Sequence, residues 1–292
     1  MRLGLGAAQF GLDYGVSNRS GRTPPAEVRN ILSLAAERGL ALIDTAPGYG
    51  DSESVLGECL PRNHGFLIST KIKPMRTDII TSEHLETVRK MFAESLARLR
   101  QDHVHAVLIH HVEDLLVDGG DALMQLLEGF RERGLVDRIG VSIYEAREAD
   151  ELAGRYQLGV LQVPVSVVDQ RSIQGGAIGR WARGGTEIHA RSVFLQGFLL
   201  MKPDELPPAL RHHSPMLERF RNFARENDCL PAHIALKFID SQKDIASAIV
   251  GVNTAAQLEQ LLAFEECKID CSDLRQFAQQ DLQLLNPFLW RQ

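Results

Sequence analysis

The sequence predicts an α/β protein with one domain, a (β/α)8 barrel of the TIM type over residues 1–292. Short apolar segments alternate with amphipathic segments of helical length along the chain, which is typical of parallel strands joined by crossover helices. A doubly wound open sheet uses the same alternation. Eight apolar segments occur, and this count favours a closed barrel. No linker rich in Pro, Gly or Ser divides the chain.

Each expected strand is a short run of apolar or β-branched residues. In chain order, the expected strands span residues 3–10, 41–46, 66–72, 105–111, 138–144, 159–167, 187–194 and 245–252. The expected helices between them have capping residues at their starts or glycines after their ends. These helices span residues 23–40, 81–99, 120–135, 231–242 and 254–266.

The segment 203–228 differs from the rest because it begins with the polar, proline-rich stretch PDELPPALRHHSP. We expect a long excursion here. It follows the seventh strand, so it should lie on the face of the barrel that carries the active site. The pair His212–His213 within it is expected to be solvated or part of a mobile lid.

Composition and charge exclude several classes of function. The net charge is −6 and no block of Lys or Arg stands out, so nucleic acid is not an expected partner. No apolar run reaches the length of a membrane span. The four cysteines form no CxxC pair, and we expect free thiols in a reducing compartment, the cytoplasm. A monomer is the expected state because no exposed apolar stripe is evident.

Four reactive side chains stand where the second, third and fourth expected strands end. Asp44 ends the second strand and Tyr49 follows on a loop between two glycines, while Lys71 and His110 end the next two strands. The carboxyl ends of barrel strands meet at one rim, which is where the active sites of such barrels lie. Taken singly, each residue has a structural explanation, such as a turn cap or a solvated rim lysine. Their joint placement predicts a catalytic site.

The four groups have a coherent chemistry. A phenol has a pKa of about 10, and a neighbouring ammonium group lowers it. We therefore expect Lys71, held by Asp44, to lower the pKa of Tyr49, and His110 to orient a substrate carbonyl. Together they would protonate a carbonyl oxygen while its carbon is attacked. None of the four donates hydride, so a cofactor is required.

The ordered segments LIDTAPGYGDSESVLGECL, FLISTKI, VLIHHVEDL, GVSIYEA and GVNTAAQLEQLL resemble those of the aldo-keto reductases across nearly the whole chain. The resemblance implies reversible reduction of an aldehyde or ketone by NAD(P)H. Asp44, Tyr49, Lys71 and His110 would be the catalytic tetrad, with Tyr49 as general acid in reduction and general base in oxidation. A small-molecule carbonyl compound would be the partner.

The resemblance also implies which residues bind the cofactor without a Rossmann domain. They are Ser142 and Gln162 at the nicotinamide amide, Arg191, Ser192, Leu195 and Gly197 along the ring and pyrophosphate, and Gly251, Asn253, Thr254 and Gln257 near the adenosine phosphate. Arg191 stands where an aromatic residue is common in the family, and we expect its guanidinium group to stack on nicotinamide. Gln257 and Gly251 stand where Arg and Lys often bind the 2′-phosphate. NADPH is the expected cofactor, and NADH is possible.

Two other functions remain as alternatives. The first is a non-catalytic or slow cofactor-sensing regulatory subunit with the same fold. The second is a metal-dependent barrel hydrolase, for which His110, Asp44 and His189 are the plausible ligands. The leading interpretation expects no metal.

Overall fold

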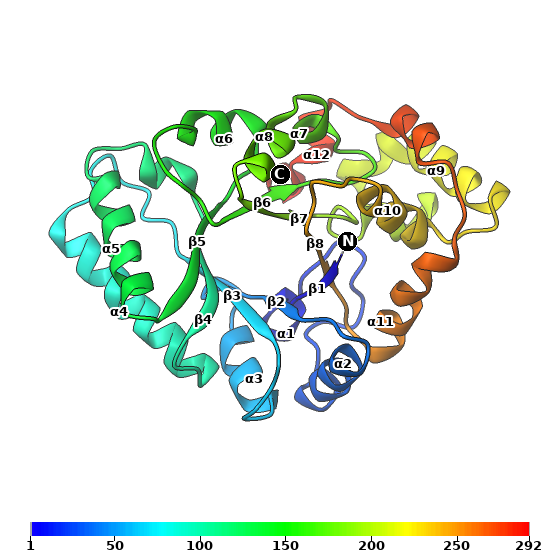
Figure 1. Ribbon diagram of the computed structural model, residues 1–292. Coiled ribbons are helices and arrows are strands. Elements are labelled where there is room, and N and C mark those ends of the chain that lie inside the picture. The colour runs from blue at the N-terminus through cyan, green and yellow to red at the C-terminus, as the bar shows by residue number, and fades with distance from the viewer. Residues whose placement is uncertain (1, 292) are drawn as a thin grey trace.

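The computed structural model describes residues 2–291, and both ends of the predicted domain 1–292 lie outside this range. Eight parallel strands close into a barrel in chain order, and β8 pairs with β1. Figure 1 shows the ring of strands with the helices outside it. The strands are β1 (Arg2–Gly6), β2 (Leu42–Asp44), β3 (Leu67–Ile72), β4 (Val104–Ile109), β5 (Val136–Ser142), β6 (Val160–Pro164), β7 (Glu187–Arg191) and β8 (Ser247–Gly251). The predicted barrel and all eight strands are confirmed.

The helices that cover the barrel begin at the predicted signals. Pro25 lies in the first turn of α2, and Thr81 and His84 form a capping box at the start of α4. The helices of the crossover connections and the C-terminal region are α2 (Pro25–Glu37), α3 (Ser52–Cys59), α4 (Ser82–Leu99), α5 (Gly120–Glu132), α6 (Ala146–Leu152), α7 (Arg171–Gln174), α8 (Ala177–Arg183), α9 (Ser214–Glu226), α10 (Pro231–Asp240), α11 (Ala255–Leu262) and α12 (Leu282–Leu285).

Two segments differ from the sequence-based expectation. The first strand ends at Gly6, and the short helix α1 (Ala8–Gly11) replaces its expected second half. The excursion 203–228 is more ordered than expected. It contains the 3-10 helices η3 (Pro203–Glu205) and η4 (Pro208–His213), and then α9, whose buried apolar face includes Leu217 and Phe220. Prolines and polar residues at its start concealed this apolar periodicity.

The expectation of four free thiols is wrong for two of them. Cys229 and Cys267 form a disulfide that links residues 38 apart in sequence, with their Cα atoms 5.6 Å apart. Cys59 and Cys271 are free. The spacing of cysteines along the sequence does not reveal this disulfide, because only the fold brings its two segments together. The cytoplasmic location, which depended in part on free thiols, stays a prediction.

Among residues 2–291, no helix has both the length and the apolar character needed to span a membrane.

Candidate active site

The centre of the site is a buried ion pair at the rim of the barrel. Asp44 ends β2, and Lys71 lies on the neighbouring strand β3. The Lys71 Nζ atom lies 2.7 Å from both carboxylate oxygens of Asp44 and 2.9 Å from the carbonyl oxygen of Thr45. Only 1% of the Lys71 side chain and 5% of the Asp44 side chain are exposed. All three ammonium protons of Lys71 are therefore directed at acceptors on Asp44, the last residue of β2, and Thr45, which follows it.

Tyr49 lies above this pair, as predicted. Lys71 Nζ is 5.0 Å from the centroid of the Tyr49 ring, and the His110 ring meets the Tyr49 ring edge to face with centroids 6.3 Å apart. The structure thus brings the four predicted catalytic side chains together, although they come from three strand ends and a loop. The neighbouring His111 instead lies near Glu113 and Asp114, as alternation along the strand predicts.

The pKa shifts of Tyr49 and His110 set the protonation state of each group at neutral pH. Burial raises the pKa of the Tyr49 phenol, the Asp44 charge raises it further, and Arg191 opposes both. Burial, helped by Lys71 and Arg191, lowers the pKa of His110 to about 3. At neutral pH the phenol is therefore protonated and the imidazole is neutral.

The expectation of a lowered Tyr49 pKa is wrong for the protein alone, because burial and the Asp44 charge raise it. The lysine directs its protons at Asp44 and Thr45, so it makes no hydrogen bond to the phenol. Burial also lowers the pKa of Lys71 itself, although the Asp44 charge opposes that shift.

Two glycines shape the loop that carries Tyr49. Gly50 has φ +57°, and a Cβ atom there would lie 2.4 Å from the carbonyl oxygen of Gly11. A Cβ atom on Gly11 would lie 1.9 Å from the carbonyl oxygen of Tyr49. The two backbone segments therefore touch, and this contact fixes the height of the phenol above the barrel. Gly48, on the other side of Tyr49, has nothing within 4 Å of its ideal Cβ position.

This contrast gives a matched pair of variants. We expect Gly50→Ala to lose about 1–3 kcal/mol of stability from the left-handed backbone alone. We also expect turnover to fall by about 10²-fold, because the phenol would be displaced from the position predicted for proton donation. Gly48→Ala should leave both quantities near wild type. Urea unfolding and steady-state kinetics on the two variants check this, and equal behaviour would show that the loop is not held as described.

Ser142 and Gln162, the residues predicted at the nicotinamide amide, lie beside the ion pair. Ser142 donates a hydrogen bond to Gln162 over 3.2 Å, and the Gln162 amide donates to Asp44 over 2.7 Å. Both side chains are buried, so this amide and hydroxyl group form a polar floor next to Tyr49. Their chemistry fits a carboxamide ligand, which needs one donor and one acceptor.

The loop after β7 has an unusual backbone. Ser192, Leu195 and Gln196 have φ values of 59°, 50° and 52°, and Gly197 has φ 93°. Left-handed non-glycine residues cost about 1–3 kcal/mol each and cluster at ligand sites. A Cβ atom on Gly197 would lie 1.9 Å from the Ser17 hydroxyl oxygen, so this loop is pressed against the loop after α1. The strained backbone fits a segment that holds a ligand.

Arg191 projects into the same region but has another stacking partner. Its guanidinium carbon lies 4.4 Å from the centroid of the Tyr144 ring, and it donates hydrogen bonds to Ile143 and Ser192. Its Nε atom is buried without a partner among the described residues. Whether it also stacks on nicotinamide stays a prediction.

The predicted phosphate segment at the start of α11 is closed by side chains of the protein. The Thr254 hydroxyl group accepts a hydrogen bond from the backbone N–H of Gln257. The side-chain carbonyl oxygen of Gln257 accepts one from the backbone N–H of Asn253. The Ala255 amide donates to the Glu27 carboxylate over 2.7 Å. This bond lowers the pKa of Glu27. Gly251, at the end of β8, lies against the side chain of Gln9.

Three side chains near the predicted site, Tyr14, Tyr144 and Glu27, were not singled out from the sequence. Tyr14 lies close enough to Tyr49 that their charges interact, and its own pKa is raised to about 12, mainly by burial. Tyr144 and Glu27 complete the set. Glycine-rich flanks marked Tyr49, but nothing comparable marks Tyr14 or Tyr144. Glu27 lies on α2 and reaches α11 only through the closure of the barrel.

The ligand set of the alternative metal-dependent hydrolase is not assembled. Asp44 is held by Lys71 and Gln162, while His189 Nε2 lies 2.9 Å from Glu187. Within residues 2–291, His110, Asp44 and His189 do not form a group of converging ligand atoms.

The chain is similar to known proteins along most of its length. The family model described as "Aldo/keto reductase family" matches residues 2–281. An NADH-specific methylglyoxal reductase of Escherichia coli is 25% identical over an alignment of 264 residues, and the match covers 79% of this chain and 80% of the relative. An L-galactose dehydrogenase of Arabidopsis thaliana is 25% identical and covers 89% of this chain and 83% of its own. An aldo-keto reductase from Bacillus halodurans, solved in its holo form, superposes with a TM-score of 0.73 at 19% identity, covering 94% and 90% of the two chains.

Proposed function

Because the chain belongs to the aldo/keto reductase family, we propose that it reduces an aldehyde or ketone to an alcohol, reversibly, with a nicotinamide cofactor. One observation carries the proposal: Asp44, Lys71, Tyr49 and His110 meet at one rim beside a polar floor that fits a carboxamide. When bound, the cofactor supplies the hydride that no side chain of the site supplies.

In the proposed reaction, the protein orients the carbonyl group and supplies the proton. The neutral imidazole of His110 and the phenol of Tyr49 hydrogen-bond the carbonyl oxygen. As negative charge grows on that oxygen, the Tyr49 proton moves to it. The buried ammonium group of Lys71 stabilises the phenolate that remains, because opposite charges attract strongly where water is excluded. Oxidation of an alcohol runs through the same groups in reverse.

For the cofactor, we propose that NADH is preferred over NADPH. The Glu27 carboxylate accepts from Ala255 at the start of α11, the segment predicted to lie near the adenosine phosphate. A 2′-phosphate placed there would meet this negative charge at short range, and like charges repel. Gln257 and Gly251 offer no compensating cation. The NADH-specific E. coli relative agrees with this preference.

The test is cofactor oxidation by the purified protein in the presence of small carbonyl compounds. Methylglyoxal is a suitable probe because the E. coli relative is named for its reduction, and glyceraldehyde serves as a second small carbonyl compound. We expect the absorbance of NADH to fall and an alcohol to appear in equal amount, with deuterium transferred when the cofactor carries it at C4. If no carbonyl compound is reduced although NADH binds, the cofactor-sensing alternative would replace this proposal.

A further inference from the structure

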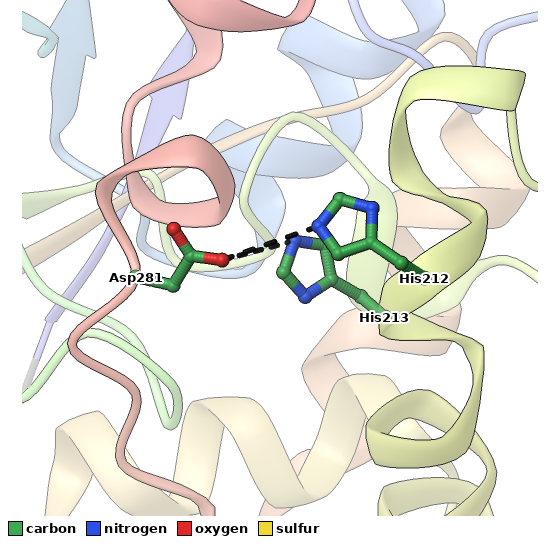
Figure 2. Close-up of side chains that lie close together, drawn as sticks. All are labelled: His212, His213 and Asp281. Carbon is green, nitrogen blue, oxygen red and sulfur yellow. Dashed lines mark ion pairs between the residues drawn. The ribbon is translucent and has the colours of Figure 1, made fainter.

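A second cluster of reactive side chains lies away from the tetrad, between the excursion and the C-terminal tail. Figure 2 shows the rings of His212 and His213 pointing toward the carboxylate of Asp281. The Nε2 atoms of His212 and His213 lie 4.0 and 3.7 Å from the same oxygen, Oδ2 of Asp281. The histidines end η4, and Asp281 directly precedes α12.

The distances from the two imidazoles to the carboxylate are too long for hydrogen bonds, although the three polar atoms lie within 4.8 Å of one another. Only 9% of the His213 side chain is exposed. Its Nε2 atom is buried and makes no hydrogen bond within the described part of the chain. A buried polar atom without a partner is costly, and native structures rarely keep one without a reason. Asp281 uses its other oxygen, Oδ1, to accept from the Gln283 amide at the start of α12. This bond fixes the carboxylate and leaves Oδ2 directed at the two imidazoles.

The electrostatics favour a cation at this point. The imidazole rings lie with centroids 3.8 Å apart, so protonating both would bring two positive charges together. A neutral imidazole presents a lone pair, which is the form that binds a metal. Asp281 adds one negative charge.

We propose that His212, His213 and Asp281 bind one divalent transition-metal ion, such as Zn²⁺, with water as the fourth ligand. Zinc takes nitrogen and carboxylate ligands at about 2.0–2.2 Å in a tetrahedron, which separates ligand atoms by roughly 3.4 Å. The two separations from Asp281 Oδ2, 4.0 and 3.7 Å, exceed this by about 0.6 and 0.3 Å, and all three ligand atoms lie within 4.8 Å of one another. His212 is 59% exposed and its ring is free to turn the remaining distance. Two nitrogen ligands make Mg²⁺ and Ca²⁺ poor occupants.

The ion would link two segments that border the predicted cofactor loop. Phe198, which follows Gly197 of that loop, meets the His213 ring at a centroid distance of 6.4 Å and the Trp290 ring at 6.3 Å. Trp290 in turn donates a hydrogen bond to the carbonyl oxygen of Gln283 in α12. A metal ion would therefore act as a structural clip. This inference is independent of the proposed carbonyl reduction, and it replaces the expectations of a solvated histidine pair and of no metal.

The test is isothermal titration of untagged, chelator-treated full-length protein with Zn²⁺, and with Co²⁺ to record the absorption of a tetrahedral site. We expect one equivalent to bind with a dissociation constant in the micromolar range or below. A saturating excess of Zn²⁺ should raise Tm by roughly 5 °C. His212→Ala and Asp281→Asn should each weaken binding by at least about 10-fold. Asn keeps an oxygen that can cap α12, so Asp281→Asn separates the metal contact from the helix cap.

The matched control is His103→Ala. His103 is another exposed histidine near a carboxylate, Asp137, but it precedes β4 at the other end of the barrel. This variant should bind Zn²⁺ as the wild type does. Zinc binding that survives His212→Ala and Asp281→Asn, or that is lost in His103→Ala, would overturn the proposal, as would the absence of binding in the micromolar range. His212 is exposed, so a folding defect does not confuse the result.

Discussion

Replacing Tyr49 with Phe is expected to lower kcat by about 10²–10⁴-fold, the range that a positioned proton donor contributes. Phe keeps the ring that meets His110 and lies over Lys71, and it removes only the hydroxyl group. The variant should therefore fold as the wild type does. Steady-state oxidation of NADH by a carbonyl substrate measures the effect.

A suitable control is Tyr156→Phe. The Tyr156 hydroxyl group is also within hydrogen-bond distance of polar atoms, the carbonyl oxygen of Leu115 and the carboxylate of Asp121, but it lies outside the site. The Tyr156→Phe variant should therefore have a kcat within a small factor of the wild-type value. If Tyr49→Phe retained its rate, the proton would have to come from another group, and the role given to this phenol would be wrong.

Replacing Lys71 with Met is expected to destabilise the fold by about 3–5 kcal/mol, because it leaves the Asp44 carboxylate buried without its counter-ion. Both side chains are almost fully buried. The double variant with Asp44→Asn removes the orphaned charge as well, so it should recover much of the stability while remaining inactive. Urea unfolding measures the first effect and turnover measures the second.

The exposed pair Arg22–Asp51 gives the matching control, since its side chains are 51% and 70% exposed. Arg22→Met should change stability by no more than about 1 kcal/mol. A loss of that small size in Lys71→Met would mean that the buried pair contributes no more than a surface contact. A double variant as unstable as Lys71→Met alone would mean that packing, and not charge, causes the loss.

The barrel and the meeting of Asp44, Tyr49, Lys71 and His110 at its rim were predictable because both depend on local patterns. Each strand is an apolar run with its own boundary signals, and parallel strands in a barrel all end at the same rim. Residues that end strands, such as Asp44 and Lys71, are therefore brought together by topology alone. The Cys229–Cys267 disulfide and the contact of Glu27 with α11 were not predictable, because both join segments whose approach depends on the packing of the outer helices.

The direction of the Tyr49 pKa shift could not be predicted from the sequence, for a different reason. The sequence contains Lys71, which would lower this pKa, but it does not show which acceptors the three ammonium protons of Lys71 face. Only the geometry reveals that Asp44 and Thr45 receive them, and that burial dominates at the phenol. In the same way, the sequence predicts only a solvated pair or a mobile lid at His212 and His213, and the structure shows that Asp281, nearly seventy positions later, faces them.

The central claim is that this rim is a nicotinamide site built around Tyr49, and fluorescence titration with NADH and NADPH in parallel tests it most directly. The account predicts that wild type and Tyr49→Phe bind NADH equally, in the micromolar range or tighter, and that both bind NADPH more weakly. Equal or tighter binding of NADPH would contradict the role given to Glu27. Failure of both cofactors to bind would contradict the claim itself, because the tetrad would then have no source of hydride.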